Sequence, residues 1–112
     1  MYRDLIVISL NQYYRDLILT RLTELKVVSD QKLLNDVEQS SQRVSYQVGT
    51  LSDYLLANRQ DLGNEIPKII ELLTEAKILV TGMRDKFPSN TSFNMLIQHS
   101  INSIDLNLEK LK

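Results

Sequence analysis

Residues 34–55 read LNDVEQSSQRVSYQVGTLSDYL, and their apolar positions recur in alternating steps of three and four. This spacing places the apolar side chains on one stripe of an α-helix. The same spacing recurs from Ile66 to Phe87 and from Ile97 to Leu111, and a broader stripe runs from Val7 to Val28. The pattern predicts amphipathic helices that bury their stripes against one another.

Few residues interrupt these helices, since the 112 residues include only 3 glycines and 2 prolines. Folds rich in strands or loops need more turn residues than this. Phe87-Pro88 ends one helix because the residue before proline is pushed out of the helical region. A second break is expected at residues 61–64 (DLGN). A third break is expected at Val27-Val28-Ser29-Asp30, although this stretch contains neither Gly nor Pro. Two β-branched valines precede a pair of residues that can cap a helix, and one continuous helix of nearly sixty residues is rare in a domain this small.

These observations predict an all-α fold, an antiparallel up-down-up-down four-helix bundle with helices at about 3–28, 31–59, 65–86 and 91–111. The whole chain, residues 1–112, is expected to form a single helical-bundle domain. The stripes resemble one another in chemistry, so the order of the helices around the bundle and its handedness stay open.

The composition excludes several function classes. The 13 basic and 14 acidic residues give a net charge of −1, so we expect no strong direct nucleic-acid binding. The chain has no cysteine, hence no disulfide and no thiolate metal site. No apolar run reaches the length of a membrane span. The run Leu5–Ile8 continues into polar residues without a cleavage site, so it is not a secretion signal, and we expect an intracellular protein.

The sequence offers little catalytic chemistry. No glutamate has a histidine three residues later, the spacing that carboxylate-bridged metal sites in bundles use. The glycines are isolated, so no phosphate-binding loop is present, and no Gly-x-Ser-x-Gly motif accompanies the single histidine. We therefore expect no catalytic residue, no cofactor and no metal, and a protein that is not an enzyme.

The single histidine, His99, lies opposite the apolar stripe of the last expected helix. An exposed histidine on a four-helix bundle resembles the layout of histidine phosphotransfer domains. That family has a lysine three residues after the histidine, followed by glycine, whereas this chain has Asn102 and Ser103. The cation that would stabilise a phosphohistidine is thus missing from the pattern.

Formal charge is unevenly distributed, because Asp105 is the only charged residue from Phe87 to Leu108. Interface cores are depleted in charge while tolerating neutral polar groups. We therefore expect an outer strip of the last helix to contact a second chain, with these residues: Met95, His99, Asn102 and Leu106. A second apolar strip is expected on the first helix, at Leu5, Ile8 and Leu19. The alternative is that this second strip covers the first within the same chain.

A strip of small residues follows one side of the second expected helix: Ser41, Ser45, Gly49 and Ser52. A glycine inside a helix costs about 0.5–1 kcal/mol of stability relative to alanine, so the presence of Gly49 needs an explanation. One explanation is the close approach of a neighbouring helix, and the other is random sequence change at an exposed position.

The most consistent function is a non-enzymatic protein–protein interaction module, a small helical adaptor, regulator or complex subunit that docks on a partner protein or forms a homo-oligomer. An accessory helical subunit of a nucleic-acid-processing assembly is the alternative. A histidine phosphotransfer-like domain that uses His99 comes third.

Overall fold

The computed structural model describes the backbone of residues 2–31, 34–85 and 91–112 and the side chains of residues 9–31, 35–85 and 92–112. Four long helices make up most of it: α1 (Tyr2–Asp30), α2 (Leu34–Ala57), α4 (Ile66–Asp85) and α5 (Thr91–Leu111). The short helix α3 (Arg59–Leu62) and the 3₁₀ turn η1 (Gly63–Glu65) join α2 to α4. The predicted all-α helical bundle is confirmed.

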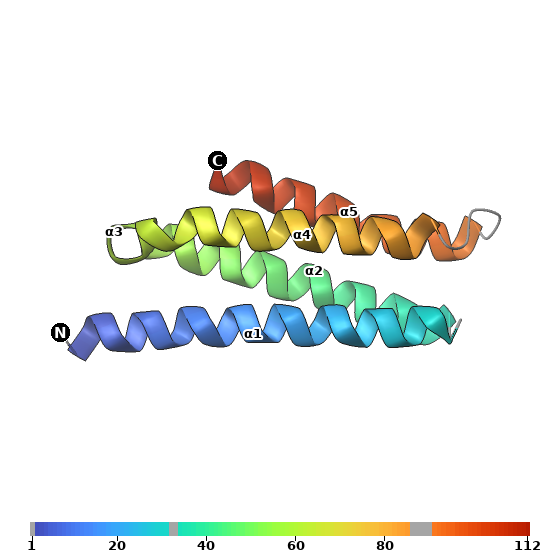
Figure 1. The fold of residues 1–112 in the computed structure, drawn as a ribbon, viewed down its shortest axis with the longest axis horizontal. Coiled ribbons are helices and arrows are strands. Elements are labelled where there is room, and N and C mark those ends of the chain that lie inside the picture. Colours follow the sequence, from blue (N-terminus) through green and yellow to red (C-terminus); the bar gives the residue numbers. More distant parts are fainter. Residues whose placement is uncertain (1, 32–33, 86–90) are drawn as a thin grey trace.

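Successive long helices alternate in direction, but they are not all neighbours in space (Figure 1). α2 packs along both α1 and α5, and α4 packs along α5. α1 and α4 meet only over a short stretch, while α1 and α5 make no extended contact. The α3–η1 connection therefore crosses the bundle diagonally, and the order around it is α1, α2, α5, α4.

The core consists of the stripes that the spacing predicts. In the middle of α2, α4 and α5, the side chains of Val44, Leu73 and Ile104 are all fully buried. The other buried apolar residues of these helices continue the same three- and four-residue steps: Val37, Val48, Leu51, Leu55, Ile69, Ala76, Val80, Met83, Phe93, Ile97, Ile101, Leu108 and Leu111. Each helix therefore contributes one stripe to a common core.

The first break lies later in the chain than predicted. Residues 27–30 are helical, and the backbone N–H of Gln31 still donates to the carbonyl of Val27 at 3.1 Å. Val28 packs against the core, and this apolar contact holds the last turn in the helix. The predicted turn at Val27–Asp30 is therefore wrong. The predicted break at Phe87-Pro88 lies outside the described residues.

The second break is more ordered than a simple loop. α2 ends at Ala57, where the N–H of Asn58 donates to the carbonyl of Tyr54 at 3.1 Å. Within α3, Leu62 is fully buried and anchors the connection on the core. Pro67 lies in the first turn of α4, where its missing N–H is not needed.

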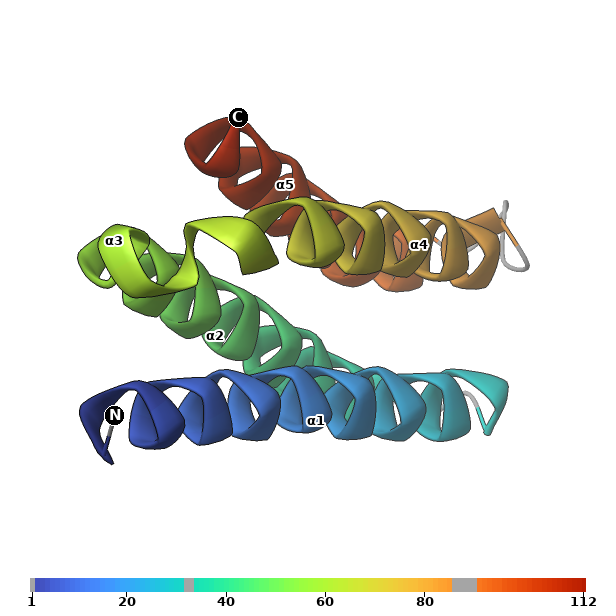
Figure 2. The same cartoon turned by 60° about the vertical axis from the view of Figure 1, so that its left-hand side comes forward.

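The N-terminal half of α1 is less covered than the sequence predicts. α2 crosses α1 at an angle and the two helices diverge toward the N-terminus of α1 (Figures 1 and 2). Ile18, Leu22 and Leu25 are buried in the C-terminal half, whereas Leu10 is 41% exposed. Leu10 is thus a correction to the predicted stripe, because at this level the buried side of α1 is centred on Asn11, which is 3% exposed, and Leu10 lies to one side of it.

An aromatic contact joins α1 to the C-terminal part of α2. The rings of Tyr14 and Tyr54 have centroids 5.0 Å apart in a tilted arrangement. Burial raises the pKa of Tyr54 above its ordinary value of 10.0, and the neighbouring Tyr14 and Asp61 raise it further. This contact holds the two helices together where their backbones diverge.

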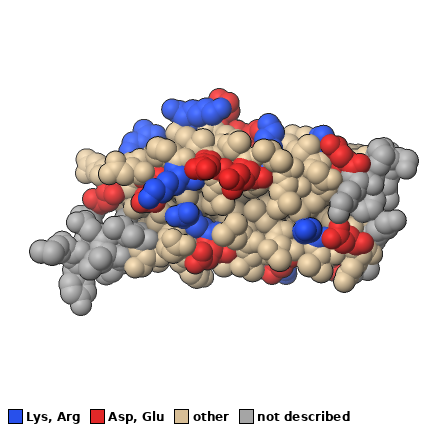
Figure 3. Space-filling model, in the orientation of Figure 1, with Lys and Arg blue, Asp and Glu red and all other residues tan. Residues whose placement is uncertain are grey.

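The face formed by α1 and α4 carries acidic and basic side chains interspersed with uncharged ones (Figure 3). Two ion pairs link α5 to neighbouring helices. Nζ of Lys77 on α4 lies 2.7 Å from Oδ1 of Asp105, and Nζ of Lys110 lies 3.8 Å from Oδ1 of Asp53 on α2. Among the described residues, none of the helices combines the length and apolar character that crossing a bilayer requires.

Candidate functional site

The outer side of α5 carries the residues we call the α5 strip: Met95, His99, Asn102 and Leu106. Their spacing places them on the side of the helix opposite the buried stripe that contains Ile101. Met95 is 69% exposed and Leu106 is 59% exposed, and the two polar residues between them are exposed as well. Two large apolar side chains therefore face water from one side of one helix.

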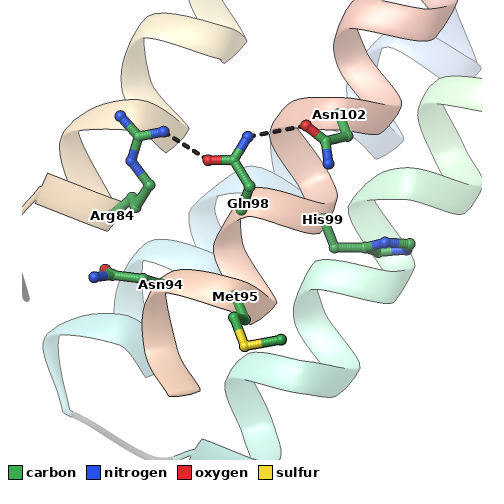
Figure 4. A pocket seen from close by; sticks show the side chains of 6 residues that line it. All are labelled: Arg84, Asn94, Met95, Gln98, His99 and Asn102. Atoms are coloured by element: carbon green, nitrogen blue, oxygen red, sulfur yellow. Dashed lines mark hydrogen bonds between the residues drawn. The ribbon is translucent and has the colours of Figure 1, made fainter. Parts of the chain in front are cut away.

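A groove of about 490 Å³ runs between α4 and α5 beside this strip (Figure 4). Nη1 of Arg84 donates to Oε1 of Gln98 at 2.6 Å, and Nε2 of Gln98 donates to Oδ1 of Asn102 at 2.9 Å. Nε of Arg84 also donates to Oδ1 of Asp85 at 3.1 Å, which offsets its charge. The groove therefore has a fixed polar wall, and Met95 contributes apolar lining to it.

A second groove of about 280 Å³ lies on the other side of the strip, between α2 and α5. Glu38 and Gln42 of α2 line it together with Met95 and His99. The same two α5 residues line both grooves, so they form a ridge with a hollow on each side. In Figure 4, His99 extends from this ridge toward α2.

The helices beneath the second groove are joined by two buried serines. The hydroxyl of Ser41 donates to the carbonyl of Leu96 at 2.7 Å, and the hydroxyl of Ser100 donates to the carbonyl of Ser41 at 3.1 Å. The two hydroxyl oxygens also contact each other. These bonds require close approach of α2 and α5, and they fix the axial position of the ridge relative to α2.

The other members of the small-residue strip lie in different surroundings. Ser52 is buried and Ser45 is partly buried. A Cβ atom added at Gly49 would meet no atom within 4 Å. The expectation of close packing therefore does not hold at Gly49, because the space beside it is open, and the close approach lies at Ser41 instead.

The structure does not bring the apolar strip of α1 onto the α5 strip. Leu19 is about half exposed on α1, which makes no extended contact with α5. The alternative that residues of α1 cover the α5 strip is therefore wrong for Leu19. The side chains of Leu5 and Ile8 lie outside the described residues, although both belong to α1.

The chemical groups around His99 are mostly neutral. Position 102, three residues after it, carries an amide that accepts a hydrogen bond from Gln98. In the part of the chain that the structure describes, no three or more His, Cys, Asp or Glu side chains group closely enough to hold a metal ion. The arrangement suits contact with a polar and apolar surface, with one titratable ring at its centre.

Comparison with known proteins identifies no relative. No family model matches the chain, and neither a curated protein nor a solved structure matches it. The site is therefore interpreted from its own geometry.

Sequence reasoning missed two residues that shape the first groove. Gln98 lies midway between Asn94 and Asn102 at four-residue steps, and this run of amides is a signal that could have been read. Arg84 comes from α4, and its place beside Gln98 depends on the relative axial position of two helices. Periodicity within a single helix contains no information on that position.

Proposed function

We propose that this chain is a non-enzymatic, intracellular protein–protein interaction module that contacts another protein chain through the α5 strip. The observation that supports this proposal most is the joint exposure of Met95 and Leu106, at 69% and 59%, on a strip of α5 whose four residues carry no formal charge, since Glu109 and Lys110 lie beyond Leu106. Single exposed apolar residues are common on monomers, whereas two on one side of a helix with neutral polar residues between them suit an interface, whose core is depleted in charge.

The shape of the surface supports the same proposal. Met95 stands between two grooves, so a partner side chain can enter on either side of it. Methionine is flexible and polarisable, which suits it to contact surfaces. The hydrogen bonds of Arg84, Gln98 and Asn102 hold the polar wall in place before a partner arrives. A preorganised surface loses less side-chain entropy on binding.

The test is the double substitution Met95→Asp and Leu106→Asp. Two carboxylates within the contact would be desolvated without a partner, so binding should fall by at least tenfold. Both side chains face water in the isolated chain, so the helical circular dichroism and the melting temperature should change little. Binding is measured by co-purification from an extract of the native source with the unmodified chain as reference.

The matched control is Ile78→Asp combined with Val27→Asp. Ile78 is 70% exposed on α4 and Val27 is 50% exposed on α1, so the control adds the same charges away from the α5 strip. The control should keep the partner. If the α5 variant keeps the partner as well, or if both variants lose it, the α5 strip is not the contact surface. If the α5 variant unfolds, Met95 and Leu106 support the fold instead.

The other functions expected from the sequence have less support among the described residues. The neutral amide of Asn102 occupies the place where a phosphotransfer domain has its cation. The interspersed charges of Figure 3 do not form a basic surface on that face that would suit a nucleic-acid backbone.

A further inference from the structure

Between Met95 and Leu106 the exposed side of α5 carries no formal charge, since Glu109 and Lys110 lie beyond Leu106, and in this it differs from the exposed sides of the other long helices. Those sides each carry charged residues: Asp16 and Lys26 on α1, Arg43 and Asp53 on α2, and Glu71 and Glu75 on α4. In a two-fold symmetric dimer each surface meets a copy of itself. A charged strip then risks placing like charges together, whereas the neutral α5 strip can meet its own copy without that cost.

The order of residues along the strip is also symmetric. Met95 and Leu106 lie at equal distances from a point midway between residues 100 and 101, and so do His99 and Asn102. When two such helices run antiparallel across a two-fold axis at that point, Met95 of each copy meets Leu106 of the other. Each imidazole likewise meets an amide.

We propose that the partner of the α5 strip is a second copy of this chain. Two α5 helices pack antiparallel about a two-fold axis that passes between residues 100 and 101. Met95 of each copy packs on Leu106 of the other, and His99 of each faces Asn102 of the other. This inference rests on the proposed function and names the partner for the same surface.

The surroundings of the strip are compatible with this pairing. Antiparallel helices place opposite ends of their dipoles side by side. At the α4 margin, Arg84 is paired with Asp85 at 3.1 Å within the chain, so its charge is offset before the copies meet. At the α2 margin, Glu38 lies beside Met95 and His99, near one end of the strip. The two-fold axis then puts the two Glu38 side chains at opposite ends of the interface.

One pair of helices gives an interface at the small end of the range for protein dimers, where stable complexes bury at least about 1,200 Å² in total. We therefore expect a weak dimer, with a dissociation constant in the micromolar range.

Cysteine cross-linking tests the arrangement without interference, because the chain contains 0 cysteines. In the antiparallel dimer, position 95 faces position 106 of the other copy, while like positions are about 16 Å apart along the helices. Disulfides need Cα atoms within about 7 Å of each other. Under mild oxidation, a mixture of Met95→Cys and Leu106→Cys chains should give at least five times more covalent dimer than either variant alone.

The control for random collision is Ile78→Cys, which is equally exposed on α4. Its covalent dimer sets the background that each single α5 variant should match. If Met95→Cys alone and Leu106→Cys alone both cross-link as well as the mixture, the helices are parallel and the proposed arrangement is wrong. If the mixture stays at the background, the strips do not meet at all.

Sedimentation equilibrium separates a failure of this inference from a failure of the proposed function. The unmodified chain should approach the dimer mass as its concentration rises through the micromolar range, and Met95→Asp/Leu106→Asp should remain monomeric. A chain that is monomeric up to about 1 mM, or a variant that still dimerises, overturns the self-pairing. If that variant nevertheless loses a different protein in the co-purification, the proposed function stands while this inference falls.

Discussion

The hydroxyl oxygens of Ser41 and Ser100 contact each other inside the packing of α2 against α5, and each hydroxyl also donates to a carbonyl of the opposite helix. Two small polar side chains thus replace apolar contacts at this point of the packing between the two helices. The bonds fix the axial position of α5, and with it the position of Met95 between its two grooves.

Removing one of these hydroxyls should destabilise the fold. Ser41→Ala and Ser100→Ala should each lower the free energy of unfolding by about 0.5–1.5 kcal/mol, because each removes a hydrogen bond between the two helices together with the contact between the hydroxyls. The double variant should cost less than the sum by about 0.5–1 kcal/mol, since the bonds are shared. Urea unfolding measures all three, and Ser92→Ala, on the exposed side of α5, is the control. Strictly additive losses would show that the serines act independently.

Gly49 should accept a side chain. A Cβ atom there meets nothing within 4 Å, so Gly49→Ala should raise the free energy of unfolding by about 0.5–1 kcal/mol through helix propensity. Gly82→Ala on α4 has the same open surroundings and should give a similar gain. A loss of stability at Gly49 alone would mean that a neighbouring group packs against that position after all.

Leu73 tests the core. Its side chain is fully buried on α4, so Leu73→Ala should cost about 2–5 kcal/mol of unfolding free energy. Glu71→Ala, on the exposed side of the same helix, should change stability by less than about 0.5 kcal/mol. Thermal and urea unfolding measure both, and equal effects for the two variants would contradict the position of α4.

Tyr54 should make the fold sensitive to alkaline pH. Because burial raises the pKa of Tyr54, the unfolded chain loses the phenolic proton at lower pH than the folded chain does. The unfolded state then binds fewer protons, so this contribution to stability is present below pH 10 and is lost as the pH rises further. Tyr54→Phe should lose less stability between about pH 8 and pH 11 than the unmodified chain. Tyr46→Phe, an exposed tyrosine on the same helix, is the control, and equal losses in both variants would contradict the assignment.

Much of the fold could be predicted because helical periodicity is a local property. Val44, Leu73 and Ile104 fall on their stripes whatever the helices pack against, and all three are buried. The helix order depends on which stripes meet, and stripes of similar chemistry do not specify that. Leu10 lies on a predicted stripe but stays exposed, because the buried side of α1 at this level is centred on the neighbouring Asn11, and which polar residue a neighbour covers does not follow from periodicity.

The exposed side of α5 follows from the same local periodicity, since residues opposite a buried stripe must face outward. The grooves beside it do not, because they depend on the relative axial positions of different helices. Arg84 of α4 lines one groove and Glu38 of α2 the other, so each comes from a different helix than Met95 does. The break between α1 and α2 was misplaced because the packing of Val28 against the core outweighs the weak helix propensity of the residues around it.

The most direct test of the α5 strip as a contact surface is hydroxyl-radical footprinting of Met95 in the chain diluted in buffer and in the chain within an extract of the native source. Tyr46, 68% exposed on α2, matches Met95 at 69% and corrects for scavenging by the extract, while Met83 is a buried reference. We expect Met95 oxidation relative to Tyr46 to fall several-fold in the extract, because another chain covers the side chain there. An unchanged ratio of Met95 to Tyr46 oxidation would contradict the account.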